Sequence, residues 1–228
     1  MSTEPKKGFT LVEMLVVISI IVMLAGMILP VLSKARRKGV ETECKSNLKQ
    51  FGSALELAKT DNNERLPGRL TNLYPSYCDN KELFICPADI TNGKEGGKPD
   101  SDEKKDWESD GDETIEKGLK INSSYFYEFS EVECKWNFEF VGSAEEITGD
   151  PDGKPTWNQV KYYQLRHGDD WSRDIEHFFY PEDRFPVVRC FWHVFNTNVQ
   201  RDKIIKNLAF SGRVFESPTK WEDGAFNN

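Results

Sequence analysis

The sequence predicts an α+β fold in which a long N-terminal helix packs against an antiparallel sheet. Met14 to Leu32 is an apolar run without a charged residue, and apolar residues then recur with helical spacing as far as Ala58. Beyond Leu119 the spacing changes to the alternation typical of strands with one buried face. With the apolar run set aside, about 190 residues remain, enough for one domain with a sizeable core.

The apolar N-terminal stretch is long enough to cross a membrane. From Phe9 to Leu32 the only charged residue is Glu13, and a helix of this length spans a hydrocarbon core of roughly 30 Å. A carboxylate in such a helix is costly, so it is a functional candidate for which a partner should exist. Cleavage after Gly8 would create an amine on Phe9, one helical turn from Glu13, and so supply that partner.

Helical periodicity continues beyond this stretch with spacings of 4, 4, 3, 4 and 3 residues. It predicts one helix from Phe9 to about Asn62, apolar all round in its first half and on one side in its second. Pro30 lacks a backbone donor and clashes with the preceding turn, so we expect a helix kink there. The apolar residues with this spacing are Val40, Cys44, Leu48, Phe51, Leu55 and Ala58.

The start of the chain resembles the precursors of type IV pilins and type II secretion pseudopilins. The matching residues are Lys6, Lys7, Gly8, Phe9, Thr10, Leu11 and Glu13. The resemblance implies cleavage between Gly8 and Phe9 by a prepilin peptidase after a basic leader, N-methylation of Phe9, and assembly of the helix into a fibre through Glu13. The alternative is a plain signal anchor that tolerates Glu13 near the interface. A secretory signal peptide fits less well, because its apolar region would be shorter and end in a small-residue cleavage site.

The same resemblance implies an organisation and a location. Residues 1–8 would be the leader peptide, 9–32 the transmembrane and assembly half of the helix, and 33–228 a periplasmic pilin-like α+β domain. The protein would cross the inner membrane once and enter a periplasmic or extracellular filament. Its partners would be the peptidase, the inner membrane, and other copies or related subunits. The four basic residues at 34–38 would favour the opposite orientation by the positive-inside rule, and we follow the resemblance.

Acidic residues are concentrated in one segment. The net charge is −8, and residues 95–116 contain ten acidic residues against three lysines. We expect residues 91–117 to form an acidic surface loop, because they contain almost no apolar side chains. A domain of this charge repels phosphate backbones, so no nucleic-acid partner is predicted.

If the domain lies outside the cytoplasm, its five cysteines can form disulfides, because disulfides persist there. Spacing does not fix their connectivity. We take Cys44 and Cys86 as the preferred pair and Cys134 and Cys190 as the next, with Cys78 left over. The alternative is that all five are small buried hydrophobic residues. Cys44 with residues 47–50, and Cys86 within residues 84–89, look like a pseudopilin-like subgroup that carries both elements.

Several strands are expected in the second half of the chain. A short helix and loops should occupy residues 65–89. Strands are expected at 125–129, 134–140, 160–165 and 187–195. A hairpin is expected at 207–216 around a two-residue Ser211-Gly212 turn; pairing Phe210 with Arg213 would place Leu208, Phe210 and Phe215 on one face.

Candidate catalytic or metal chemistry is sparse. No nucleophile elbow, P-loop or dinucleotide-binding motif is present, so we predict no enzyme, no catalytic residue and no cofactor. Asp110, Asp112, Asp150 and Asp152 are weak calcium candidates, because they do not form an EF-hand loop and acidic loops are common.

One further pair, Cys190 and His193, has the spacing of half a zinc site. On a regular strand these two side chains point to opposite faces, and no second half is evident in the sequence. We therefore predict no metal site.

The sequence favours a structural subunit of a type II secretion pseudopilus or a type IV pilus-like filament. The alternative is a membrane-tethered periplasmic binding module, or a tethered enzyme, that does not polymerise.

Overall fold

The computed structural model describes residues 9–94, 114–115, 119–134, 138–169, 179–193, 204–218 and 221. Two compact units are present, Met1–Thr42 and Glu43–Asn228, and each is described by itself. Lys6, Lys7 and Gly8 lie outside the described residues, as does most of the acidic segment with Asp110 and Asp112.

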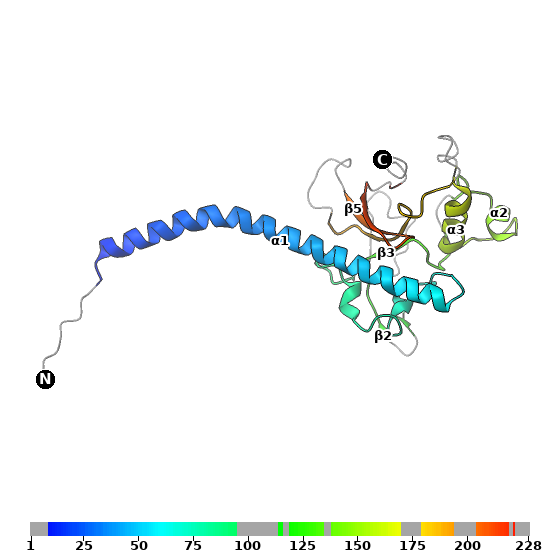
Figure 1. Ribbon diagram of the computed structural model, residues 1–228, viewed down its shortest axis with the longest axis horizontal. Helices are drawn as coiled ribbons and strands as arrows, with labels where there is room; N and C mark the ends of the chain where they lie inside the picture. The colour runs from blue at the N-terminus through cyan, green and yellow to red at the C-terminus, as the bar shows by residue number, and fades with distance from the viewer. Residues whose placement is uncertain are drawn as a thin grey trace. The chain divides into compact units, whose positions relative to one another are not determined.

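A single helix, α1, runs from Leu11 to Asp61 (Figure 1). This confirms the predicted long helix. α1 continues through Pro30, whose carbonyl accepts a hydrogen bond from Ser33 Oγ at 3.0 Å, and the kink stays a prediction. The helix ends where Asn63 adopts a left-handed conformation, with a φ of 54°, as asparagine does at helix ends.

In the Glu43–Asn228 unit, α1 buries one face. Phe51 packs edge-on against Phe84 and Tyr125, with ring centroids 5.2 Å away in both cases. Gly52 lies on the same part of the helix and leaves room for Leu208 of the sheet. The buried residues of α1 are Cys44, Leu48, Phe51, Ala54, Leu55 and Ala58, which confirms the predicted amphipathic half.

The sheet has four antiparallel strands in the order β3-β4-β5-β6. They are β3 (Phe126–Tyr127), β4 (Pro186–Cys190), β5 (Ile205–Ala209) and β6 (Val214–Ser217). Every residue of β4 and β5 is buried, so these central strands are covered on both faces. The protein is therefore of the α+β class, with a long helix packed with an antiparallel sheet as in a pilin-like fold.

The remaining elements are short. Residues 65–89 contain two 3₁₀ helices, η1 (Leu70–Leu73) and η2 (Lys81–Phe84), as expected for a short helix and loops. Helix α2 spans Ala144–Thr148. Strands β1 (Thr114–Ile115) and β2 (Leu119–Lys120) form a separate antiparallel pair, so β1 lies within the segment predicted to be only a loop.

One of the predicted strands is wrong, two are too long, and one lies partly outside the described residues. Residues 160–165 lie in helix α3 (Trp157–His167), whose first turn is fixed by a capping box between Thr156 and Gln159. Of residues 134–140, the structure describes 134 and 138–140, and these are not in a strand. Phe138 begins a turn, and its side chain packs on the cluster around Trp157. The strands expected at 125–129 and 187–195 are shorter in the structure, where they are β3 and β4.

The β5–β6 hairpin is confirmed, but its register differs from the prediction. Leu208 pairs with Val214, and Asn207 pairs with Phe215. The turn therefore contains three residues, 210–212, and Gly212 takes the left-handed conformation that such a turn needs, with a φ of 81°. Phe215 consequently lies on the opposite face from Leu208, and the predicted three-residue apolar face is wrong.

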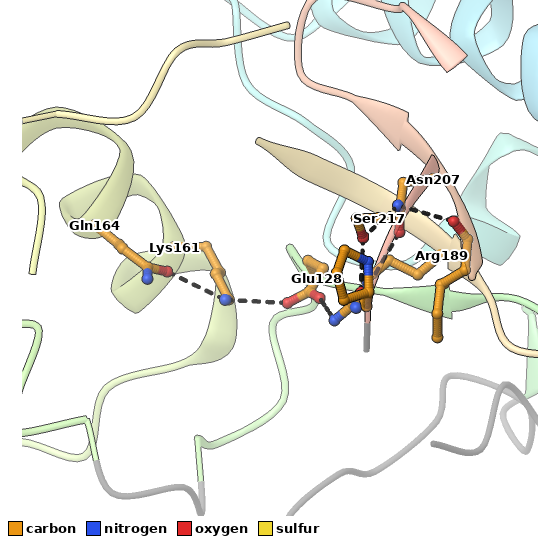
Figure 2. Close-up of polar contacts among 8 residues, drawn as sticks. Glu128, Lys161, Gln164, Arg189, Asn207 and Ser217 are labelled. Atoms are coloured by element: carbon orange, nitrogen blue, oxygen red, sulfur yellow. Dashed lines mark hydrogen bonds and ion pairs between the residues drawn. The ribbon is translucent and has the colours of Figure 1, made fainter. Parts of the chain in front are cut away.

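A buried ionic network joins α3 to the sheet. Glu128 lies between Lys161 of α3, at 3.2 Å, and Arg189 of β4, at 3.1 Å. The side chains of these three residues are 0%, 1% and 3% exposed, so solvent screens the pairs very little. Arg189 Nε also donates to Asn207 of β5 at 3.2 Å, and Lys161 donates to Gln164 at 3.1 Å (Figure 2).

Removing the carboxylate of this network should destabilise the fold strongly. In Glu128→Ala, the buried cations of Lys161 and Arg189 lose their shared anion. We expect the free energy of unfolding to fall by about 3–5 kcal/mol, measured by urea denaturation of the full chain in detergent.

The matched control is Glu133→Ala. Glu133 pairs with Lys154 at 3.6 Å, and both side chains are exposed, so a change below about 1 kcal/mol is expected. Equal losses in the two variants would contradict a stabilising role for the buried carboxylate.

Candidate functional site

The first turn of α1 is closed by a reciprocal capping interaction. The Thr10 amide and hydroxyl donate to Glu13 Oε2 at 2.8 and 2.7 Å, and the Glu13 amide donates to Thr10 Oγ1 at 3.3 Å. Both ends of the pattern Thr-x-x-Glu thus satisfy backbone donors that a helix start leaves unpaired. Sequence reasoning treated Glu13 as an assembly residue and missed this pattern, which is visible in the sequence.

The partner proposed for Glu13 does not yet exist in the uncleaved chain. Phe9 is joined to residue 8 by a peptide bond, and its side chain is exposed. In this state the Glu13 carboxylate accepts from Thr10, and its contact with a Phe9 amine stays a prediction. Because Thr10 stabilises the helix start without that amine, the carboxylate is already held near the position where cleavage would create the positive charge.

The apolar half of α1 is exposed throughout the described part of the Met1–Thr42 unit. Every residue from 9 to 39 is exposed, and the segment is long and apolar enough to cross a membrane. Ser19, a polar residue inside it, donates its hydroxyl to the Leu15 carbonyl at 2.7 Å, so this hydroxyl is paired within the helix. Such a surface is unfavourable in water and favourable in lipid or against other helices.

In the Glu43–Asn228 unit, three thiols and one imidazole meet at one point. The Sγ atoms of Cys44, Cys86 and Cys190 and a ring nitrogen of His193 all lie within 4.8 Å of one another. Cys86 Sγ is 3.4 Å from Cys190 Sγ and 3.2 Å from His193 Nε2. The three cysteines are buried and His193 is partly buried.

Three different parts of the fold carry these four residues. Cys44 lies on the buried face of α1, and Cys86 follows η2. Cys190 is the last residue of β4, and a turn then carries His193 back to it. The prediction that Cys190 and His193 point to opposite faces is wrong, because the strand ends before the alternation reaches His193.

The predicted disulfides are not present in the structure, where all five cysteines are free. Cys44 and Cys86 are brought together as predicted but remain thiols. Cys134 lies in the hydrophobic cluster around Trp157, whereas Cys190 belongs to the main core. Cys78 is half-buried, and burial followed by the charge of Asp79 raises the pKa of its thiol to about 11.

Hydrogen-bond donors point at two of the three thiols. The Ala88 amide donates to Cys86 Sγ at 3.5 Å, and the Tyr125 hydroxyl donates to Cys44 Sγ at 3.9 Å. Hydrogen bonds from Cys190 and then Cys86 lower the pKa of the Cys44 thiol, although burial opposes the shift. Burial, and then the charge on Cys44, raise the pKa of Tyr125 well above its ordinary value, so its hydroxyl remains a donor.

The loop after Cys86 is ordered by a buried carboxylate. Asp89 Oδ1 accepts from the amide and the hydroxyl of Thr91, both at 2.7 Å. Its Oδ2 accepts from the Gly93 amide at 2.7 Å and the Ser124 hydroxyl at 2.6 Å. The Asp89 amide in turn donates to the Cys86 carbonyl at 2.8 Å, so the aspartate fixes the backbone that carries this thiol.

Two other polar features are also described. Asp150 and Asp152 are exposed, and Asp150 Oδ1 accepts from the Asp152 amide at 3.1 Å, which is the geometry of a local turn. Calcium binding at Asp150 and Asp152 stays a prediction.

An open hollow of about 1060 Å³ lies between the end of α1 and α3, and its lining includes Arg65, Tyr162 and His167.

Comparison with known proteins identifies the N-terminal segment. The prokaryotic N-terminal methylation motif matches residues 5–29. These residues form the prepilin-type cleavage and methylation segment of type IV pilins and pseudopilins. No curated protein and no solved structure matches the chain. The motif and the exposed apolar helix support a membrane-anchored, pilin-like or pseudopilin-type protein, a class of structural subunits rather than enzymes.

Weakening the Asp89 carboxylate should loosen the loop that holds Cys86. In Asp89→Asn one accepting oxygen becomes an amide nitrogen that faces donors, so we expect the free energy of unfolding to fall by about 1–3 kcal/mol. Urea denaturation of the full chain in detergent measures it. Asp79→Asn, at an exposed position, should leave stability nearly unchanged, and a similar loss in both variants would speak against the capping role of Asp89.

Proposed function

We propose that the chain is a structural subunit of a type II secretion pseudopilus or a type IV pilus-like filament. A prepilin peptidase cleaves it between Gly8 and Phe9, Phe9 is N-methylated, and the subunit assembles through the apolar half of α1. The observation that carries this proposal is the methylation motif at residues 5–29, located at the start of a fully exposed apolar helix.

The exposed helix supports storage in a membrane followed by assembly. Its apolar side chains are stable in the hydrocarbon core, and they remain dry when the same surface packs against other subunits in a filament. On this proposal residues 9–32 are the transmembrane and assembly segment, and residues 33–228 form the periplasmic domain. The partners are then the peptidase, the inner membrane and other pilin-type subunits.

Glu13 supplies the electrostatic reason for assembly. A lone carboxylate among apolar helices is costly, as is a lone amine. Cleavage produces an amine on Phe9, and a contact between this amine and Glu13 of a neighbouring subunit compensates both charges. Thr10 already holds the carboxylate at the helix start, which supports its availability for that contact.

Two alternatives use the same anchor without polymerising. A tethered binding module or enzyme would place its ligand in the open hollow between α1 and α3. Recovery of the protein from sheared extracellular fibres rather than only from membranes separates the proposal from both, and a ligand and activity screen separates the two alternatives from each other.

Removing the carboxylate should impair assembly but not insertion. In Glu13→Ala the segment 9–32 loses its only charged residue, so membrane insertion should be retained while the neighbour's Phe9 amine stays uncompensated. We expect wild-type amounts in the membrane fraction and few or no sheared filaments, both measured by immunoblotting.

Glu43→Ala is the matched control, since Glu43 is an exposed carboxylate elsewhere on α1. It should assemble normally. Normal filament yield from Glu13→Ala would remove the assembly role.

Changing the residue before the cleavage point should preserve the leader. In Gly8→Ala, we expect intact-mass spectrometry to find residues 1–8 still attached, whereas the wild-type chain should begin at methylated Phe9. Gly26→Ala is the control, because an added Cβ at Gly26 meets nothing within 4 Å, and this variant should be processed normally. Finding the leader on the wild-type protein isolated from its own cells would overturn the proposed processing.

A further inference from the structure

We propose that Cys44, Cys86, Cys190 and His193 bind one Zn²⁺ ion in a structural site with three thiolate ligands and one imidazole ligand. The four donor atoms come from α1, the segment after η2, and the end of β4 with its following turn. All four residues lie in the Glu43–Asn228 unit. The site is therefore independent of whether the chain polymerises.

The distances fit the coordination sphere of a single ion. Zinc–sulfur bonds of about 2.3 Å and zinc–nitrogen bonds of about 2.0–2.1 Å in a tetrahedron place sulfur atoms about 3.8 Å apart and sulfur and nitrogen about 3.5 Å apart. The structure has Cys86 Sγ at 3.4 Å from Cys190 Sγ and at 3.2 Å from His193 Nε2. All four donors lie within 4.8 Å of one another, so small shifts around a central ion complete the tetrahedron.

The donor set selects the metal and the kind of site. Thiolate and imidazole ligands suit zinc, whereas calcium and magnesium require oxygen ligands. Four protein ligands fill a tetrahedral sphere and leave no position for water or substrate, which is the arrangement of structural rather than catalytic zinc. An iron–sulfur cluster would need its ligands divided between separate iron atoms, but here they converge on one point.

The surroundings stabilise sulfur in its anionic, metal-binding form. The Ala88 amide points at Cys86 Sγ, and the Tyr125 hydroxyl points at Cys44 Sγ. Tyr125 is itself held by Asn47, whose amide donates to the phenolic oxygen at 3.2 Å. Donors arranged in this way orient metal ligands and are unnecessary for thiols that serve only as apolar filling.

A disulfide explains fewer of these observations. It would use two of the three thiols at a bond length of about 2.05 Å and leave the third thiol and His193 without a role. A zinc ion uses all four groups. It also joins segments that are 104 residues apart in sequence at Cys86 and Cys190, and it fixes both to α1. Such a link holds the helix, loop and sheet together without an oxidant.

The binding step balances without redox chemistry. Three thiols each lose a proton to the buffer, neutral His193 donates its ring lone pair, and Zn²⁺ with three thiolates gives a site of net charge −1. Lys206, which is buried on the neighbouring strand and paired with Glu216 at 3.0 Å, adds a small attractive electrostatic interaction with Cys44.

The direct test is the metal and thiol content of the full-length wild-type protein. The chain is purified in detergent without chelators, and its metals are measured by inductively coupled plasma mass spectrometry. We expect one zinc per chain and, after denaturation with a chelator, five titratable thiols. Absence of zinc with two fewer thiols would show a disulfide. Absence of zinc with all five thiols, or iron in its place, would equally overturn the site.

Cobalt tests the geometry of the ligands. The same protein is stripped with a chelator and titrated with Co²⁺ alone. We expect thiolate-to-cobalt charge-transfer absorption and the intense visible bands of tetrahedral cobalt, saturating at one equivalent and abolished by an equal amount of Zn²⁺. Weak octahedral bands would contradict the proposal.

Variants assign the ligands. Cys86→Ser should reduce the zinc content to near zero, whereas Cys78→Ser, at a half-buried cysteine outside the group, should retain one zinc. His193→Cys should retain zinc because a fourth thiolate replaces the imidazole. If Cys86→Ser does not fold, the wild-type protein decides: chelation should lower its urea midpoint and added zinc restore it. An unchanged midpoint, or equal zinc loss in Cys78→Ser, would overturn the assignment.

Discussion

The burial of one face of α1 is the contact on which the Glu43–Asn228 unit depends. Phe51 lies at the centre of this face, between Phe84 of η2 and Tyr125 beside β3. Each fully buried leucine or phenylalanine contributes about 1.5–3 kcal/mol, so this face supplies much of the stability of a domain whose strands are short. The same helix is apolar on all sides further toward its start, where the described residues are exposed.

The buried ionic network fixes how α3 packs on the sheet. Glu128, Lys161 and Arg189 would be costly to bury separately, and they are tolerated because each neutralises another. Lys161 must therefore reach the Glu128 carboxylate, and this restricts the position of α3. A purely apolar contact would restrict that position far less. Figure 2 shows how the chain of contacts continues from Arg189 to Asn207 and Ser217, across three neighbouring strands.

Local patterns predicted some elements and misread others for identifiable reasons. The segment at 160–165 contains β-branched and aromatic residues, which favoured a strand, but the Thr156–Gln159 capping box was the stronger local signal. The hairpin at 207–216 was found from its turn, yet its register was wrong by one residue. The left-handed Gly212 closes a three-residue loop, and a shift of one residue moves Phe215 to the other face.

The sequence by itself determined the long helix, its apolar and amphipathic halves, the prepilin-type segment with Glu13, and the α+β class, because each depends on patterns within one stretch of chain. Only the tertiary structure decided which cysteines meet, since Cys44, Cys86 and Cys190 come from separate elements whose approach no spacing encodes. It also placed His193 beside Cys190, because β4 ends where the sequence had indicated a continuing strand. Convergence of distant residues depends on packing, and packing is a property of the whole fold.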